Sequence, residues 1–267
     1  MPELPEVELT RRRLERELIG KRIRRVIVRT PRLRLPVPPE LAASLEWRRV
    51  RSVGRRGKFL LFDCEAGWLI MHLGMTGFLR LLPGPALPGK HDHLDFVFAD
   101  GSVLRFHDPR KFGSVIWSDE PAERHPRLAG IGPEPLSAAF DGAYLFRVSR
   151  TRRVAVKLLI MNMTIVAGVG NIYANEALFR AGIRPDRPAS SLTDADCERL
   201  AAAIREVLRE SIDQGSTYRV EESAVAYHPL NFAVYGRENG ACTRCGGALE
   251  STRLGNRSTV YCPRCQS

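Results

Sequence analysis

Residues 242–265 read CTRCGGALESTRLGNRSTVYCPRC, and this stretch decides how the C-terminal end of the chain folds. It holds two Cys-x2-Cys pairs with 16 residues between them, which is enough for a hairpin between two tight knuckles. A segment of about 30 residues is too short for a core of its own and needs a metal to hold it. Four thiolates are typical of a closed tetrahedral zinc site, which is structural because no position stays open for water. We therefore predict one structural zinc ion, with these ligands: Cys242, Cys245, Cys262 and Cys265.

The other two cysteines and the N-terminus indicate where the protein works. Cys64 and Cys197 stand alone, and we expect them to be buried, inert thiols. Paired Cys motifs of this kind indicate zinc ligands in a reducing compartment rather than disulfides. Met1–Thr10 contains three glutamates and no apolar run of the kind found in a signal peptide, and no stretch of the chain is apolar enough to cross a bilayer. We therefore expect a cytoplasmic protein that makes no membrane contact.

The charge of the chain favours a polyanionic partner. It has 41 basic and 30 acidic residues in 267, and residues 1–60 hold 17 of the basic ones against seven glutamates. Nucleic acid fits this surface best, although a solvated basic face is the alternative. The terminal hairpin carries Arg253, Arg257 and Arg264, so it suits a DNA contact or, equally, a ribbon that binds another protein.

The pattern along the chain predicts an α+β, multidomain protein. Residues 4–19 have the apolar spacing of a helix, and short strand-like runs then follow as far as residue 118, with a hairpin turn at Asp100-Gly101. Several short strands with turns between them indicate a β-sandwich or a barrel, and of the two we predict an N-terminal β-sandwich with flanking helices. After a Pro- and Gly-rich segment at 121–135, helices are predicted at 171–181, capped by Asn171, and from a Thr193–Asp196 capping box to Gly215.

The first residues, Met1-Pro2-Glu3, permit two interpretations. Proline and glutamate at the start of a helix are ordinary capping chemistry. Removal of Met1 would instead leave Pro2 with a secondary amine, and an α-amino group titrates near ~8, well below a lysine. Such an amine can attack an electrophilic carbon, and Glu3 beside it could move a proton.

Several motifs together resemble the bacterial formamidopyrimidine-DNA glycosylase family. The start PELPEV (2–7) and the Cys quartet agree with it, as do GKFLL (57–61), HLGMTG (72–77), HDH (91–93), DPRKFG (108–113), VGNIYANE (169–176) and VYGR (234–237). The resemblance spans nearly the whole chain in the expected order. It implies a catalytic β-sandwich domain at 1–131, a linker at 132–151, a helical domain with a helix–two-turns–helix motif at 152–235 and a zinc finger at 236–267.

The resemblance also implies an activity, a bifunctional glycosylase and lyase of base-excision repair. Such an enzyme flips an oxidised purine out of the duplex and forms a Schiff base through its N-terminal proline. It then cuts the strand by β,δ-elimination. Pro2 carries over as the nucleophile and Glu3 as the proton donor. Lys58 and Arg257 carry over as the groups that assist the first and second eliminations.

The DNA-binding residues follow from the same motifs. Met75, Arg110 and Phe112 correspond to the trio that fills the space left by the flipped base, and glycines beside them indicate exposed turns. Further contacts are implied for His72, His91, Arg152, Lys157 and Asn171. The expected partner is double-stranded DNA with oxidised bases, bound by a monomer at the nucleoid of a bacterial cytoplasm.

Residues 216–233 depart from the family pattern. The family carries a flexible loop here, with an aspartate and several glycines, that closes over 8-oxoguanine. This chain has neither residue type between Ser216 and Val234, so the cap is missing or rebuilt around Tyr218, Tyr227 or Phe232. Two alternatives therefore stay open. One is the same mechanism with a preference for oxidised pyrimidines, as in the endonuclease VIII branch, and the other is a non-catalytic zinc-ribbon DNA-binding protein.

Overall fold

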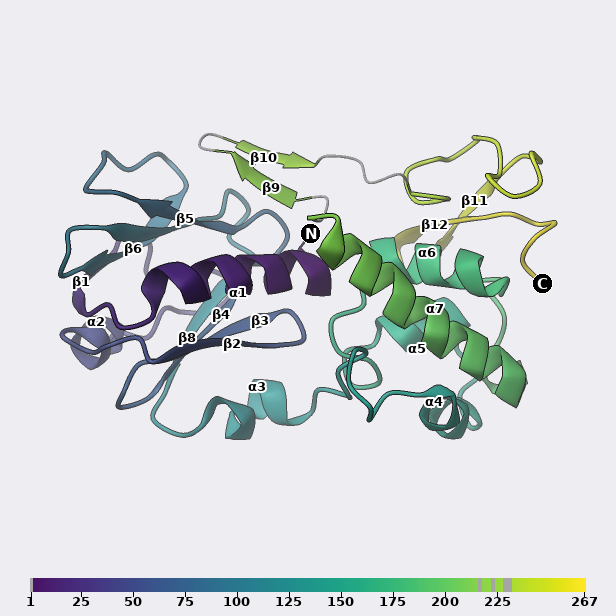
Figure 1. Cartoon of the computed structure of the whole chain (residues 1–267), viewed down its shortest axis with the longest axis horizontal. Helices are drawn as coiled ribbons and strands as arrows, with labels where there is room; N and C mark the ends of the chain where they lie inside the picture. The colour runs from purple at the N-terminus through teal and green to yellow at the C-terminus, as the bar shows by residue number, and fades with distance from the viewer. Residues whose placement is uncertain (1, 216–217, 222–223, 228–231) are drawn as a thin grey trace. The chain divides into compact units, whose positions relative to one another are not determined.

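The computed structural model describes residues 2–215, 218–221, 224–227 and 232–267, drawn in Figure 1. It separates into two compact units. The first contains Met1–Ala129 and Gly215–His228, and the second contains Gly130–Gln214 and Pro229–Ser267. The first unit ends close to the expected boundary at 131, but residues 215–228 belong to it and not to the helical part. Within the described ranges, no helix is both long and apolar enough to span a membrane.

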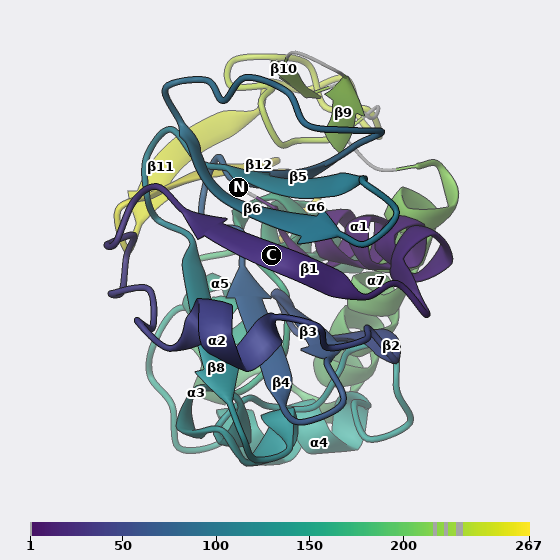
Figure 2. The ribbon, with the colours of Figure 1, turned by 90° about the vertical axis from the view of Figure 1, so that its left-hand side faces the viewer.

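The first unit is built on two antiparallel four-stranded sheets, which lie one above the other in Figure 2. One sheet has the order β1 (Ile23–Val28), β6 (Asp92–Phe98), β7 (Val103–His107), β5 (Phe78–Leu82). The other has the order β2 (Ser52–Arg56), β3 (Phe59–Asp63), β4 (Trp68–His72), β8 (Ser114–Ser118). The predicted hairpin at Asp100-Gly101 is confirmed by the pairing of β6 with β7. A β-sandwich is therefore the scaffold of this unit, as the spacing of short strands indicates.

Helices close the open sides of the sandwich. Helix α1 (Leu4–Leu18) packs against β2 and β3, and α2 (Leu41–Leu45) packs against β1 and β8. The apolar face of α1 inserts Val7, Leu14 and Leu18 into the core between the sheets. Each such buried side chain stabilises the fold by about 1.5–3 kcal/mol. The end of α1 that carries Pro2 is therefore fixed to the sandwich. The unit is completed by these short elements: the 3-10 turn Ala122–Arg124, α3 (Pro126–Ala129), β9 (Tyr218–Glu221) and β10 (Ala224–Tyr227).

The second unit is helical and ends in the hairpin. Its helices are α4 (Gly142–Ser149), α5 (Val156–Met161), α6 (Asn171–Ala181) and α7 (Asp194–Asp213), with a 3-10 turn at Ala189–Ser191. Helices α4 and α6 both pack against α7. The hairpin consists of β11 (Glu250–Leu254) and β12 (Arg257–Tyr261). Residues 132–151, expected to be a linker, are part of this unit, because Phe140 and Leu145 are buried and α4 packs on α7.

Local signals explain where the helices begin and end. The capping box of α7 is confirmed, since Asp196 N–H donates to Thr193 Oγ1 and Thr193 N–H donates to Asp196 Oδ2. Gly182 ends α6 in the left-handed region at φ +71°. The prediction that Asn171 caps α6 was wrong by one position: Gly170 is the N-cap, and Asn171 is the first helical residue. Its side chain is therefore available for contacts outside the helix.

Candidate functional site

Pro2 and Glu3 are held by the first turn of α1. Both residues are buried. The backbone N–H of Glu3 donates to Glu6 Oε2 at 2.7 Å, and the Glu3 carboxylate accepts from the backbone N–H of Glu6. A helix N-terminus favours negative charge, so this arrangement stabilises both carboxylates where they lie. The geometry places the two predicted chemical groups on a rigid helix end. Met1 lies outside the described residues.

Lys58 lies in the turn between β2 and β3, and Arg55 ties this turn to α1. The Arg55 guanidinium donates to Glu8 Oε2 of α1 at 3.0 Å and to the backbone oxygen of Gly57 at 2.9 Å. Gly57 takes φ +55°, a left-handed conformation that glycine adopts without strain. The Arg55 guanidinium therefore bridges the helix that carries Pro2 and the turn that carries Lys58. The sequence did not reveal the role of Arg55, because its carboxylate partner Glu8 is 47 residues away and its other partner is the backbone oxygen of Gly57, which no sequence pattern marks.

His72 ends β4 and faces Phe59, its partner in β3, with ring centroids 4.8 Å apart. Its Nδ1 accepts the backbone N–H of Gly74 at 3.0 Å, so the neutral ring carries its proton on Nε2. Burial lowers the pKa of His72 to about 4, and the charges of Lys58, Arg34 and Arg127 add to the effect. At neutral pH the ring is therefore an uncharged hydrogen-bond donor close to Lys58.

Acidification is expected to weaken the fold through His72. Its pKa is about 4 in the folded chain and 6.5 in the unfolded chain. Its contribution to stability is therefore complete above pH 6.5 and is lost as the pH falls toward 4. Because the side chain is half-buried, we expect about 1–2 kcal/mol between pH 7 and pH 4.5. Urea unfolding of wild type and His72→Gln across this range measures it. Equal pH slopes for the two proteins would contradict the assignment.

The predicted trio Met75, Arg110 and Phe112 is brought together by two adjoining turns. Phe112 is 40% exposed, and the Arg110 guanidinium lies 4.7 Å from the centre of its ring. Gly74, at φ +72°, is where the turns touch: a Cβ there would come within 2.4 Å of the Gly113 nitrogen. Only glycine permits this approach. An apolar residue, an aromatic ring and a guanidinium are thus presented on one edge of the first unit.

Asp108 joins the two turns. Its carboxylate is fully buried, with Oδ1 accepting from the Thr76 hydroxyl at 3.0 Å and Oδ2 accepting from the Gly113 N–H at 2.7 Å. Its backbone N–H donates to His91 O at 3.0 Å, and its backbone oxygen lies 2.8 Å from His93 Nε2. The turn that carries Met75 and the turn that carries Phe112 therefore meet at the Asp108 side chain, while the segment that carries His91 is held by the Asp108 backbone.

Replacing Asp108 with alanine is expected to destabilise the first unit by about 2–4 kcal/mol, because the buried Gly113 N–H and the half-buried Thr76 hydroxyl lose their acceptor. Asp108→Asn should cost less than half as much, since an amide oxygen can still accept from Gly113 and the Thr76 hydroxyl can turn to accept. Thermal unfolding of both variants, with Thr76→Val as a single-contact control, measures the difference. A smaller loss for alanine than for asparagine would contradict the role of Asp108.

His91 is half-buried next to an ion-pair network. Its ring packs edge-on against His107, with centroids 5.8 Å apart, and His107 Nδ1 lies 2.7 Å from Asp92 Oδ1. Asp92 also pairs with Arg80 and Arg105. Burial raises the pKa of the Asp92 carboxyl, but the hydrogen bond to His107 and the two guanidinium charges outweigh this effect and hold the pKa below its usual range. His91 therefore lies at the surface of a rigid polar cluster.

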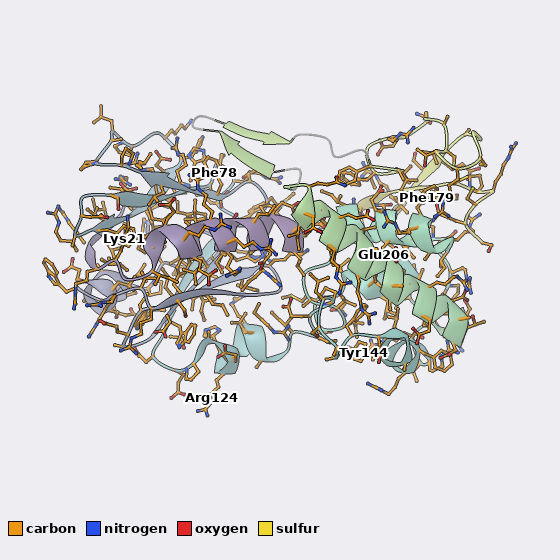
Figure 3. The ribbon with its side chains drawn as sticks, in the orientation of Figure 1. Lys21, Phe78, Arg124, Tyr144, Phe179 and Glu206 are labelled. Atoms are coloured by element: carbon orange, nitrogen blue, oxygen red, sulfur yellow. The ribbon has the colours of Figure 1, made fainter. Side chains whose placement is uncertain are left out.

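In the second unit, the four predicted zinc ligands converge. All four sulfur atoms lie within 4.8 Å of one another. Two measured separations are 3.9 Å, between Cys242 and Cys265, and 3.6 Å, between Cys245 and Cys262. A tetrahedron with Zn–S bonds of about 2.3 Å has edges of about 3.8 Å, so these residues fit a zinc ion. The knuckles pack on Phe179 of α6, labelled in Figure 3.

The hairpin that carries Arg257 is fastened to the helices by buried polar groups. Lys157 of α5 is fully buried, and its ammonium donates to Ser258 O at 2.6 Å and to Thr259 Oγ1 at 2.7 Å. Asn175 Oδ1 accepts the backbone N–H of Val260 at 3.0 Å. Arg257 itself is exposed at the start of β12. We expected Lys157 to contact a phosphate. The structure instead places it inside the protein, where its contacts hold the hairpin.

Two more predicted DNA-binding residues belong to the second unit, and one of them, Asn171, contacts the hairpin. Asn171 donates to Ser258 Oγ at 3.4 Å, while its buried Oδ1 has no hydrogen-bond partner among the described residues. Arg152 is exposed after α4, with its guanidinium donating to Val148 O at 3.1 Å. Both residues are therefore placed where a ligand of the second unit could reach them.

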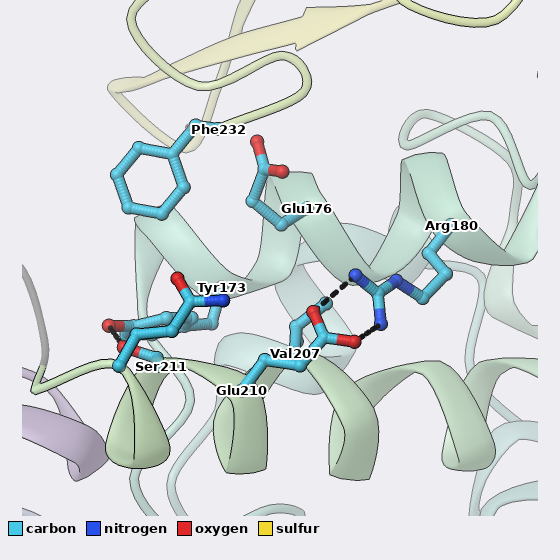
Figure 4. Close-up of a pocket in the computed structure, with 8 residues that line it drawn as sticks. Tyr173, Glu176, Arg180, Val207, Glu210, Ser211 and Phe232 are labelled. Atoms are coloured by element: carbon cyan, nitrogen blue, oxygen red, sulfur yellow. Dashed lines mark hydrogen bonds and ion pairs between the residues drawn. The ribbon is translucent and has the colours of Figure 1, made fainter. Parts of the chain in front are cut away.

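Glu176 is a functional candidate that composition and spacing did not single out. Its buried carboxylate accepts three backbone N–H groups at 2.8–3.0 Å, those of Ala233, Val234 and Tyr235. Beside it lies a cavity of about 150 Å³, shown in Figure 4, between α6 and α7 and bordered by Phe232. The cavity is crossed by the pairing of Arg180 with Glu210 at 2.6 Å. The end of the unusual segment is thus pinned to α6. The side chains of Tyr218 and Tyr227, named as possible parts of a rebuilt cap, lie outside the described residues.

Three family models match the chain. They are the formamidopyrimidine-DNA glycosylase N-terminal domain over residues 1–115, the H2TH domain of the same enzymes over 131–222, and a zinc finger found in FPG and IleRS over 241–267. The boundaries agree with the β-sandwich, the helices and the Cys quartet described above. One structural zinc ion is therefore part of this fold.

Relatives and solved structures match over the full length. Proteins named formamidopyrimidine-DNA glycosylase from Geobacter metallireducens and Pelobacter propionicus are 78% and 76% identical, each over 100% of both chains. The MutM (Fpg) protein of Thermus thermophilus is 42% identical with a TM-score of 0.86, covering 99% of this chain and 98% of its own. A Lactococcus lactis FPG in complex with a Fapy-dG-containing DNA is 34% identical with a TM-score of 0.90, covering 100% of both. With all its domains matched in order, this chain belongs to the formamidopyrimidine-DNA glycosylase family, whose members are DNA glycosylases of base-excision repair.

Proposed function

We propose that this protein removes oxidised purines from duplex DNA and then cuts the strand at the resulting abasic site. The observation that carries the proposal is the rigid placement of Pro2 and Glu3 at the buried start of α1. Once Met1 has been removed, the Pro2 nitrogen is a secondary amine that is substantially unprotonated near neutral pH. A binding protein needs neither this amine nor the acid beside it, which disfavours a non-catalytic role.

The proposed reaction uses the residues of the chain as follows. The Pro2 nitrogen attacks C1′ of the sugar, the bond from C1′ to the base breaks, and Glu3 donates a proton as the sugar ring opens. The resulting iminium makes the C2′ proton acidic. Loss of that proton expels the 3′ phosphate, and a second elimination expels the 5′ phosphate. Lys58 assists the first departure, and Arg257 assists the second.

DNA binding would use both units. Neutral His72 offers its Nε2–H to a backbone phosphate, and Asn171 offers its side chain at the start of α6, where the helix dipole favours an anion. Arg110 and Phe112, with Met75, fill the space of the flipped base. His91 and Arg152 add further phosphate contacts. Lys157 contributes indirectly, by holding the strand that presents Arg257.

Two observations bear on the substrate. Lactococcus lactis relatives have been solved with Fapy-dG-containing DNA and with abasic-site DNA, which supports an oxidised purine and a lyase step. The segment between Ser216 and Val234 has no glycine or aspartate, which favours the second candidate, a preference for oxidised pyrimidines. We place the enzyme, as a monomer, in the bacterial cytoplasm at the nucleoid.

The test is a panel of duplexes containing 8-oxoguanine, ring-opened guanine, thymine glycol or an abasic site. We expect cleavage of both purine lesions and the abasic site, with phosphates at both ends of the gap. Strand products that retain a sugar fragment would limit the reaction to β-elimination. Equal rates on 8-oxoguanine and thymine glycol would reject the purine preference, and faster cleavage of thymine glycol would support the second candidate. Sedimentation at micromolar concentration checks the monomer.

A further inference from the structure

Trp47 is an exposed aromatic residue that the proposed reaction does not use. It lies in the turn after α2, and 59% of its surface is accessible. A large apolar side chain this exposed contributes little to the core. A single exposed apolar residue is ordinary on a protein surface, so chance is the first explanation of its position.

The backbone makes chance a poor explanation. Trp47 takes φ +63°, a left-handed conformation that is a genuine outlier for a bulky residue and that glycine or asparagine adopts readily. The turn is held in this shape by Trp47 N–H donating to Ile23 O at 2.5 Å and by Arg22 donating to Trp47 O at 3.1 Å. Tryptophan therefore occupies a position where the local conformation favours other residues. Strain of this kind points to a function of the side chain.

The charged neighbours of Trp47 are mostly basic, with the exposed Glu46 beside it as the acidic exception. Arg22 pairs with Arg49 in an antiparallel bridge, and Ile23 N–H donates to Arg48 O at 2.8 Å, so the chain before β1 and the chain after α2 form one surface. Arg22, Arg48 and Arg49 are exposed, and Glu65 lies 3.9 Å from Arg49. Ile19, 52% exposed, follows α1 one residue before Gly20, whose N–H donates to Val50 O. We name this surface, residues 19–22 and 46–49, the Trp47 platform.

The Trp47 platform lies far from Pro2. It begins where α1 ends, and Pro2 lies where α1 begins. A helix of 15 residues is about 22 Å long. Figure 3 shows Lys21 at the end of α1 that is remote from the N-terminus. A ligand on the platform is therefore separate from a base held at Pro2.

We propose that the Trp47 platform is a second nucleic-acid contact, which binds a single-stranded segment by stacking a base on Trp47 while its phosphates lie against Arg22, Arg48 and Arg49. An exposed aromatic ring with arginines in the adjoining backbone segments is the combination used to bind single strands without sequence preference. An acidic peptide is the competing occupant. It would pair its carboxylates with the same arginines but, without an aromatic ring, would not stack on Trp47.

The test keeps the main site filled. The full-length protein is saturated with a duplex carrying a tetrahydrofuran abasic analogue, and a fluorescein-labelled dT12 strand is then added. We expect a ternary complex by anisotropy, with affinity that falls steeply as salt rises. Trp47→Ala should weaken dT12 binding about tenfold, and Arg48→Ala with Arg49→Ala should reduce the salt dependence. Trp47→Phe should retain most of the binding.

Controls separate binding from folding and from catalysis. Trp47→Asn should bind dT12 as weakly as Trp47→Ala yet unfold at a higher temperature, because asparagine tolerates the left-handed turn. Arg124→Ala removes an exposed arginine beyond the platform, as Figure 3 shows, and should change nothing. Strand cleavage of a damaged duplex should stay at the wild-type rate in every Trp47 variant. No ternary complex in wild type, undiminished binding in Trp47→Ala, or displacement of dT12 by an equal concentration of a glutamate-rich peptide would each overturn the proposal.

Discussion

Pro2→Thr is expected to reduce sharply the yield of the covalent protein–DNA adduct that borohydride traps with wild type, and to lower strand cleavage by at least about 10³-fold. Proline is the one residue whose amine condenses to a permanently charged iminium. A primary amine gives a neutral imine, which must gain a proton before it draws electrons from the sugar. Threonine is similar in size to proline and fits the same buried position, so the helix start should persist.

A second proline supplies the matched control. Pro5 is buried in the first turn of the same helix but can never carry a terminal amine. Pro5→Ala should therefore retain the adduct, with only a modest loss of stability. Intact mass spectrometry of each protein reports whether Met1 is absent. An adduct of wild-type yield with Pro2→Thr would reject Pro2 as the nucleophile, and so would efficient trapping by a protein that keeps Met1.

Removing zinc is expected to unfold the terminal hairpin and to abolish specific DNA binding. Structural zinc sites in isolated fingers contribute about 10–16 kcal/mol, far more than the small apolar cluster around Val260 and Leu249 can supply. Chelation or Cys265→Ser should therefore expose the amides of β11 and β12 to hydrogen exchange. The amides of α6 and α7 should stay protected, since these helices pack on each other.

Cys197→Ala is the control for thiol chemistry. Burial raises the pKa of the Cys197 thiol, so it is inert, and its loss should leave the zinc content at one ion per chain. Elemental analysis, exchange and DNA binding are measured on the same samples. Hairpin amides that remain protected after complete loss of zinc would contradict the structural role of the metal.

Features with local causes were predictable from the sequence. The spacing of the cysteines gave the zinc site, and the Thr193–Asp196 box gave the start of α7, because each depends on residues a few positions apart. The family resemblance gave the candidate site residues. It located Pro2 and Glu3 at the start of a helix and Lys58 at a strand boundary.

Features built from distant partners were not predictable in this way. Lys157 contacts Thr259, which is 102 residues away in the sequence, and Arg55 contacts Glu8, which is 47 residues away. The residues next to Lys157 or Arg55 therefore do not indicate these contacts. A motif marks Lys157 and Asp108 as important but does not say whether they face a ligand or the protein. Their burial in the structure shows that both face the protein, since a fully buried charged group is paired with other protein groups. Helix α4 escaped prediction because a segment rich in proline and glycine precedes it.

The Glu176 carboxylate accepts hydrogen bonds from three successive backbone N–H groups, and this has a consequence for how the enzyme can evolve. The stretch after α7 begins at a fixed helix end and finishes at Ala233, which that carboxylate holds in place. With both ends anchored, insertions or deletions between them leave the helices undisturbed, and doubling the length of such a stretch costs only about 0.6 kcal/mol in chain entropy. Shorter or longer versions of this piece can thus be exchanged without displacing the helix that carries Glu176. If the segment selects the lesion as proposed, grafting the corresponding stretch from a relative is expected to alter lesion preference.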